Sequence, residues 1–175
     1  MTVIALLAGR WVLALGFWSS ATAKLADREG TFAAARSYGL PVAIASAVGL
    51  VLAPVELGVA IGLMIGVAVP VVASLASVLL VIFAAAMARS LVLGRRFPCG
   101  CGPARHDISW PLVARDLVLA ALGALVALVP PAGLALWPLM ARPLQDGAVG
   151  LLPVPAAVIV VGFAARCWGA LRRES

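Results

Sequence analysis

Five long runs of apolar residues constrain what this chain can fold into more than any other feature. They cover residues 3–22, 42–64, 67–88, 110–129 and 148–168, and a helix that crosses a bilayer needs about 20 mostly apolar residues. Apolar residues make up 64% of the chain and charged residues 11%, whereas a soluble domain has roughly half and a quarter. We therefore predict an all-α fold, a polytopic membrane helix bundle in which residues 1–175 form a single integral membrane domain.

The first four runs are expected to form a four-helix core, and the fifth a further transmembrane helix. Pro153 and Pro155 interrupt the first turns of the fifth run, but proline is tolerated near helix starts and in membrane helices. A short interfacial helix is predicted over residues 31–38, where Gly39 and Pro41 end it.

The first apolar run ends in small residues, Ser19 to Ala23, which resemble a signal-peptide cleavage site. A signal peptide has its basic residues before the apolar stretch. Here Arg10 lies inside the stretch instead. We therefore interpret this run as a transmembrane helix.

The basic residues are distributed unevenly between the two sides of a five-span topology. Eleven fall on the side of the first and third connections and the carboxyl terminus, and only Arg10 and Arg142 fall towards the other. The eleven are Lys24, Arg28, Arg36, Arg89, Arg95, Arg96, Arg105, Arg115, Arg166, Arg172 and Arg173. The positive-inside rule places this side in the cytoplasm of a plasma (inner) membrane. Topology thus explains the net charge of +6, and we expect no nucleic acid partner.

Two cysteines separated by one glycine, Cys99 and Cys101, lie in the third connection, residues 89–109, which we call the thiol loop. Such a pair can close a small, strained ring, and strain makes a disulfide labile and suited to exchange. Arg95, Arg96 and Arg105 nearby favour the reactive thiolate. We predict that Cys99 and Cys101 are catalytic and lie outside the bundle core, so that serine at both positions abolishes activity and leaves the bundle intact.

Two further residues are candidates for supporting this chemistry. His106, the only histidine, can move protons during exchange, although a lone loop histidine is more often merely solvated. Cys167, near the end of the fifth run, lies on the same side as the thiol loop and is a candidate resolving thiol. The alternative for Cys167 is a small apolar residue in helix packing.

A metal site is an alternative use of the thiol loop. Cys99, Cys101, His106 and Asp107 offer ligands for zinc or copper. Their spacing matches no standard zinc pattern, so we predict no metal. The two cysteines as ordinary small loop residues are the other alternative.

Charged residues inside the apolar runs need partners. Arg10 and Glu56 are both expected about 10 to 12 Å deep on the same side, and isolated charges are costly there. We predict that they pair, with a proton or substrate role as the alternative.

The fourth run opens with a helix-start pattern, Ser109 followed by Trp110 and Pro111. Trp110 is expected at the membrane interface. Arg115 and Asp116, one turn further on, either reach the headgroups or turn inward to a functional site. These three residues, Trp110, Arg115 and Asp116, are our candidates for cofactor binding.

The sequence resembles the MauE family of methylamine-utilisation membrane proteins, within the broader DoxX-like group of small redox-associated membrane proteins. Three regions carry the resemblance: Gly16-Phe17 through Lys24-Leu25 with Phe32 and Tyr38-Gly39-Leu40-Pro41; Pro54-Val55-Glu56-Leu57-Gly58; and Cys99-Gly100-Cys101-Gly102 with Ile108-Ser109-Trp110 and Arg115-Asp116. Family members often continue the Cys-Gly-Cys element with Phe-Gly, where this chain has Gly102-Pro103. The loop geometry expected from the family therefore does not transfer directly.

The resemblance implies a membrane partner of thioredoxin-like proteins, needed for maturation of a disulfide-rich methylamine dehydrogenase subunit. The resemblance also implies action on exported proteins, which would require a thiol loop outside the cytoplasm. The arginine distribution predicts instead that the loop lies inside. We keep the charge-based orientation, although several arginines can instead serve thiolate activation or partner docking.

We predict a membrane-embedded thiol–disulfide redox protein, a candidate oxidoreductase, that exchanges a disulfide with a thioredoxin-like partner or passes electrons to a quinone. Its surroundings are the lipid bilayer and, as open alternatives, a homodimer or a larger membrane complex. The main rival from another class is a non-enzymatic assembly or scaffold subunit. A transporter built from inverted repeats has little support, because no duplicated half is evident.

Overall fold

The computed structural model describes residues 3–99 and 107–129 of the chain. This part is helical, as predicted, and holds five helices: α1 (Val3–Ala26), α2 (Arg28–Ser37), α3 (Val42–Ile65), α4 (Val69–Val92) and α5 (Trp110–Leu128). All but α2 are long and apolar enough to cross a membrane. The predicted all-α membrane bundle is confirmed, and the protein is a multi-pass membrane protein. The predicted fifth span, residues 148–168, lies outside the described residues.

The helix boundaries differ from the predicted ones where polar residues continue a helix. α1 runs four residues past position 22 to Ala26, and α4 runs four residues past position 88 to Val92. The short helix begins earlier than residue 31, at Arg28, because the Asp27 side chain accepts a hydrogen bond from the Gly30 backbone N–H at 2.8 Å and caps it.

The turn between α3 and α4 is tight because two residues adopt left-handed backbone conformations. Gly66 ends α3 at φ 78°, and Ala68 precedes α4 at φ 45°. Pro70 then lies in the first turn of α4, a position where its missing N–H costs nothing.

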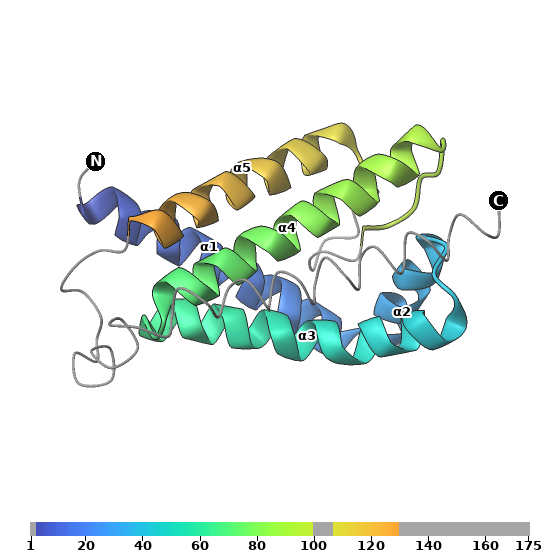
Figure 1. The fold of residues 1–175 in the computed structure, drawn as a ribbon. Coiled ribbons are helices and arrows are strands. Elements are labelled where there is room, and N and C mark those ends of the chain that lie inside the picture. The colour runs from blue at the N-terminus through green and yellow to red at the C-terminus, as the bar shows by residue number, and fades with distance from the viewer. Residues whose placement is uncertain (1–2, 100–106, 130–175) are drawn as a thin grey trace.

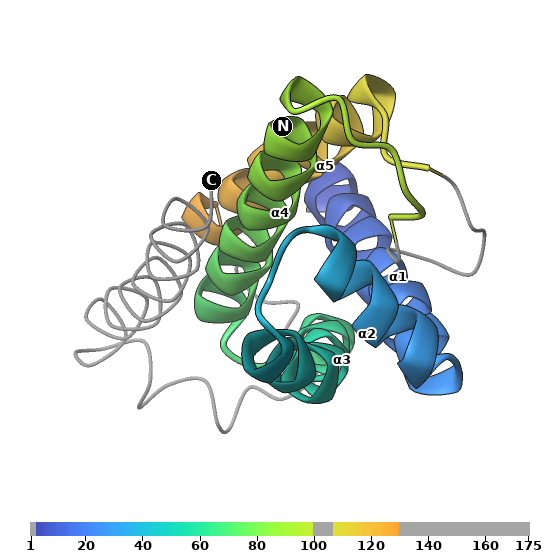
Figure 2. The same cartoon turned by 90° about the vertical axis from the view of Figure 1, so that its right-hand side faces the viewer.

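The helices pack in two antiparallel pairs (Figures 1 and 2). α4 lies along α5, and α1 lies along α3, while α2 folds back against α3. A Cβ added at Gly123 of α5 would lie 2.5 Å from Oγ of Ser77 on α4, and one at Gly9 of α1 would lie 2.8 Å from Leu122. Small residues at these positions allow the close approach of membrane helices.

Two apolar clusters form the described interior. The central cluster lies between the long helices and includes Leu13, Phe17, Leu63, Leu79 and Val126. The second, which we call the Cys99 cluster, is made of Ala84, Met87, Cys99, Ile108 and Val113. Because α4 supplies Ala84 and Met87 and α5 supplies Val113, the second cluster lies where α4 ends and α5 begins.

The outer surface of the bundle is apolar, and several charged side chains are inside. Ile4, Leu50, Val92, Val118 and Leu128 are among the most exposed large side chains. The buried charged side chains are Arg10, Lys24, Glu56 and Asp116. Apolar side chains outside and charged ones inside are the arrangement that lipid favours.

Candidate functional site

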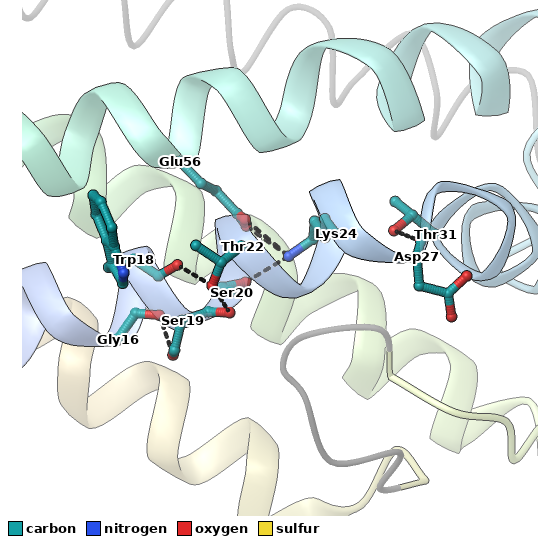
Figure 3. A network of polar contacts seen from close by, with 9 residues as sticks. All are labelled: Gly16, Trp18, Ser19, Ser20, Thr22, Lys24, Asp27, Thr31 and Glu56. Carbon is teal, nitrogen blue, oxygen red and sulfur yellow. Dashed lines mark hydrogen bonds and ion pairs between the residues drawn. The ribbon is translucent and has the colours of Figure 1, made fainter.

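A buried ion pair joins the end of α1 to the middle of α3 (Figure 3). Nζ of Lys24 lies 2.9 Å from each carboxylate oxygen of Glu56, and it also donates to Oγ of Ser20, one turn earlier on α1. The side chains of Lys24 and Glu56 are only 6% and 0% exposed. The Phe83 ring of α4 lies 5.9 Å from the same nitrogen, at a distance that allows a cation–π contact.

The pair is well satisfied, as a buried pair must be to repay its desolvation. Lys24 donates to Ser20 within α1 and to both carboxylate oxygens of Glu56, so two hydrogen bonds connect α1 to α3. Removing one partner of such a pair costs about 3–5 kcal/mol. Charged residues within membrane segments are functional candidates by default.

The predicted pairing of Arg10 with Glu56 is wrong, because Glu56 pairs with Lys24. α2 folds back along the first half of α3, so that a Cβ at Gly49 would approach the backbone of Phe32. The second half of α3, which holds Glu56, therefore meets α1, and Glu56 meets its last turns. Sequence reasoning had placed Lys24 in a connection, whereas α1 extends past it to Ala26.

Arg10 lies deep in the bundle without the partner predicted for it. Its side chain is 3% exposed, and its Nε and Nη1 make no hydrogen bond within the part of the chain that the structure describes.

Cys99 occupies the end of the bundle where the thiol loop returns from α4 to α5. The two sides of the loop are held together by a backbone hydrogen bond from Ile108 N–H to the Phe97 carbonyl at 3.0 Å and by a bridge between Pro98 and Asp107. Cys99 is 7% exposed and disulfide-bonded, with its partner sulfur outside the described residues.

The surroundings of the Cys99 sulfur are apolar. Its Sγ lies 3.6 Å from Sδ of Met87. Since a disulfide sulfur carries no proton, this is a van der Waals contact between two polarizable atoms. The Tyr38 and Phe97 rings, 4.7 Å apart in an edge-to-face arrangement, pack against the same cluster.

The expectation that Cys99 lies outside the core is therefore wrong. The loop folds back over the end of α4, and apolar side chains from α4 and α5 enclose Cys99. Arg95 and Arg96, predicted to promote a thiolate, are exposed, whereas apolar burial favours the thiol over the thiolate. Cys101, Arg105, His106 and Cys167 lie outside the described residues, and their roles stay predictions.

The inward-facing member of the predicted Arg115 and Asp116 pair is Asp116. Its side chain is 3% exposed, whereas that of Arg115 is 54% exposed. Nε and Nη2 of Arg115 lie 3.0 and 2.8 Å from Oδ1 of Asp116, so Arg115 covers the buried carboxylate from outside. Trp110, at the start of α5, is exposed. Of the four candidate metal ligands, the structure describes Cys99 and Asp107, and Asp107 is exposed.

Asp116 links the ion pair to the Cys99 cluster, because it interacts electrostatically with Lys24 of the pair and with Tyr38, which packs on the cluster. Lys24 acts electrostatically on Asp116 as well as on Glu56. Tyr38 packs on the Cys99 cluster, and burial, with the negative charge of Asp116 in addition, raises its pKa. On α5, Asp116 lies three residues after Val113 of the cluster, which is about 4.5 Å along the helix.

Sequence reasoning missed Lys24, Ser20 and Tyr38 as members of this site. One signal was present for Lys24, because it is the only lysine beside twelve arginines. A flexible ammonium and a rigid guanidinium serve different sites. Ser20 and Lys24 also have the i, i+4 spacing of helix neighbours. Tyr38 had the comparable signal of being the only tyrosine.

Known proteins similar to this chain share one description. The sequence model of a family described as methylamine utilisation protein MauE matches residues 2–137. A methylamine utilization protein MauE of Paracoccus denitrificans is 38% identical over 156 residues, which are 86% of this chain and 80% of that protein. A protein of the same name from Methylorubrum extorquens is 39% identical over 123 residues, 66% of each chain. No solved structure matches the chain.

Proposed function

Since the chain belongs to the MauE family, we propose that it is a membrane protein of methylamine utilisation that exchanges a disulfide with a thioredoxin-like partner. The observation that carries this proposal is the disulfide bond at Cys99. That sulfur lies at one end of the bundle, two residues from a second cysteine. A membrane protein with such a pair can present a dithiol or a disulfide to a protein in the adjacent aqueous compartment.

The chemistry is a pair of thiolate attacks through a mixed disulfide. In the first, a partner thiolate displaces one cysteine of the chain. In the second, the other partner thiol displaces the chain's remaining sulfur, so that a partner dithiol becomes a disulfide and the chain gains two electrons. The reverse sequence oxidises the chain. A quinone in the bilayer is the alternative electron acceptor, with Trp110, Arg115 and Asp116 as its candidate binding residues.

The buried polar residues support a functional bundle over a simple anchor. Lys24 and Glu56 are buried within helices long enough to span a membrane, and Asp116 is buried on α5, three residues from the Cys99 cluster. An anchor or scaffold needs no such charges, and they cost free energy in lipid. The position of Asp116, three residues from Val113 of the Cys99 cluster, suits an exchange protein that must tolerate changes of charge at its sulfurs.

Differential alkylation tests the proposal. Membranes that contain the full chain are equilibrated at a series of glutathione to glutathione-disulfide ratios, quenched in acid, denatured and alkylated. Intact mass then counts the free thiols. We expect one disulfide to interconvert with two thiols across the series. A number of free thiols that never changes, at any ratio, would instead indicate the scaffold function.

The link to methylamine is tested in cells that depend on this chain for growth on methylamine. We expect Cys101→Ser to abolish that growth while the amount of protein in the membrane stays unchanged. Cys167→Ser is the matched comparison for loss of a thiol, and it abolishes growth only if Cys167 is the disulfide partner of Cys99 or a resolving thiol. Normal growth of both the Cys101→Ser and the Cys167→Ser cells would contradict the proposal.

A further inference from the structure

The Cys99 sulfur is a poor target for any incoming protein thiol. It is 7% exposed and is enclosed by Ala84, Met87, Ile108 and Val113. Sδ of Met87 lies 3.6 Å from Sγ of Cys99. A thiolate on a folded partner must reach within bonding distance of the sulfur that it attacks, and this packing leaves it no room.

The same apolar environment can hold Cys99 as a neutral thiol once its disulfide has opened. Apolar surroundings favour a thiol over a thiolate, so Cys99 takes up a proton once its disulfide opens. Met87 and Val113 can pack against a thiol as well as against a disulfide, because the sulfur is small and polarizable in both states. The cluster therefore accommodates Cys99 in both redox states without rearrangement of α4 or α5.

From this geometry we infer that the two sulfurs of the disulfide have fixed and different roles, a conclusion that rests on the proposed function. The sulfur bonded to Cys99 is the one that a partner attacks, and Cys99 is the shielded sulfur that leaves. The partner thiolate forms a new S–S bond to the sulfur bonded to Cys99 while the bond between that sulfur and Cys99 breaks. Its electron pair goes to Cys99, which gains the equivalent of the proton that the partner thiol lost.

The second step follows from the same assignment. The partner's second thiol loses its proton, attacks the partner's first sulfur in the mixed disulfide, releases the chain's cysteine as a thiolate and leaves the partner oxidised. In the reverse direction, Cys99 loses its proton and, as the resolving thiolate, displaces a bound partner from that cysteine. Cys99 therefore forms no mixed disulfide with a protein in either direction.

Single-cysteine variants test this assignment. Full-length chains that keep only Cys99, only Cys101 or only Cys167 are made by serine replacement and treated in native detergent micelles with 5,5′-dithiobis(2-nitrobenzoate). We expect the Cys99-only chain to react on the order of 100-fold more slowly than the fastest of the other two, because reaction requires local opening. Comparable rates would overturn the inference.

Opening the wall around Cys99 provides a second measurement that does not depend on removing Cys99. Met87→Ala in the Cys99-only chain should accelerate the reaction on the order of tenfold, because it removes the side chain in contact with the sulfur. Met64→Ala is the matched control, since Met64 packs against the central cluster instead. Equal effects of the two substitutions would contradict the inference.

Trapping separates failure of this inference from failure of the proposed function. A thioredoxin-like protein with its second cysteine replaced by serine is mixed with the wild-type chain, and its mixed disulfide is mapped by mass spectrometry. A mixed disulfide on Cys101 or Cys167 agrees with the inference, and one on Cys99 overturns it alone. If no thiol reduces the wild-type disulfide in the folded chain, the proposed function fails and the inference fails with it.

Discussion

At the scale of single residues, the buried ion pair is the feature most sensitive to substitution. Lys24 and Glu56 satisfy each other in a setting where neither finds water. The desolvation cost of each charge is therefore offset as long as both residues are present. The same coupling makes the effect of removing one residue different from the effect of removing both.

We expect Lys24→Met and Glu56→Met each to lower stability by about 3–5 kcal/mol, because each leaves a buried charge without its partner. The double variant Lys24→Met/Glu56→Met should recover most of the loss, since apolar pairs often replace buried ion pairs at little cost. Thermal unfolding in detergent, followed by size-exclusion chromatography, measures this. A double variant no more stable than either single one would disprove the coupling.

Tyr38 offers a titration at a single residue, because it is the only tyrosine in the chain. Burial and the charge of Asp116 raise its pKa, so the folded state holds the phenol proton more tightly than the unfolded state. The resulting stability is complete below the unfolded pKa, about 10, and is lost as the pH rises from there towards the folded pKa. Phenolate absorbance should therefore appear at higher pH in the folded protein than in the denatured protein. Tyr38→Phe supplies the blank, and coincident titration curves would exclude burial of the phenol.

At the scale of helices, the pairing of α4 with α5 depends on the lack of a side chain at one position. Gly123 faces Oγ of Ser77 and the carbonyl of Ala73, which a Cβ would approach to 2.5 and 3.2 Å. This contact lies beside Leu13 of α1, so a displaced α5 also disturbs the central cluster. Close packing at small residues supplies much of the attraction between membrane helices.

We expect Gly123→Leu to separate α4 from α5 and to lower stability by about 1–3 kcal/mol, the usual cost of overpacking. Gly58→Leu on α3 is the matched control, because a side chain there meets open space, and it should be neutral or slightly stabilising. The comparison is made by thermal unfolding of both variants in the same detergent. Equal losses of stability would show that glycine itself, not the close approach, is needed.

At the scale of the whole molecule, the exposed basic residues of the described part gather at one end. The α2 helix and the connection from α4 to α5 lie at the same end of the bundle (Figure 1). These segments carry Arg28, Arg36, Arg95 and Arg96, all exposed. Lys24 belongs to the ion pair inside the bundle and no longer counts as a topological signal. The remaining arginines still favour a cytoplasmic location for this end.

Orientation is measured by labelling a chain whose only cysteine is Cys101 with a membrane-impermeant maleimide. In intact spheroplasts we expect little labelling, and in inverted membrane vesicles extensive labelling, if the arginine distribution sets the topology. The opposite pattern would place the thiol loop outside the cytoplasm, as the family resemblance implies. A Thr2→Cys chain without other cysteines tests the other side, since three candidate spans, α1, α3 and α4, separate position 2 from Cys101 and should reverse the labelling.

The sequence by itself determined which segments are transmembrane helices, because the length of an apolar run and the thickness of a bilayer decide that locally. Four of the five predicted spans lie in the described residues and are confirmed to within a few residues at each end. The inward or outward direction of Asp116 stayed open, because a single helix start permits both. Only the tertiary structure decided that Lys24, not Arg10, meets Glu56, and that Cys99 is enclosed. Both depend on how α2 and the thiol loop fold back on distant helices, and contacts between residues far apart in the chain leave no periodic pattern to read.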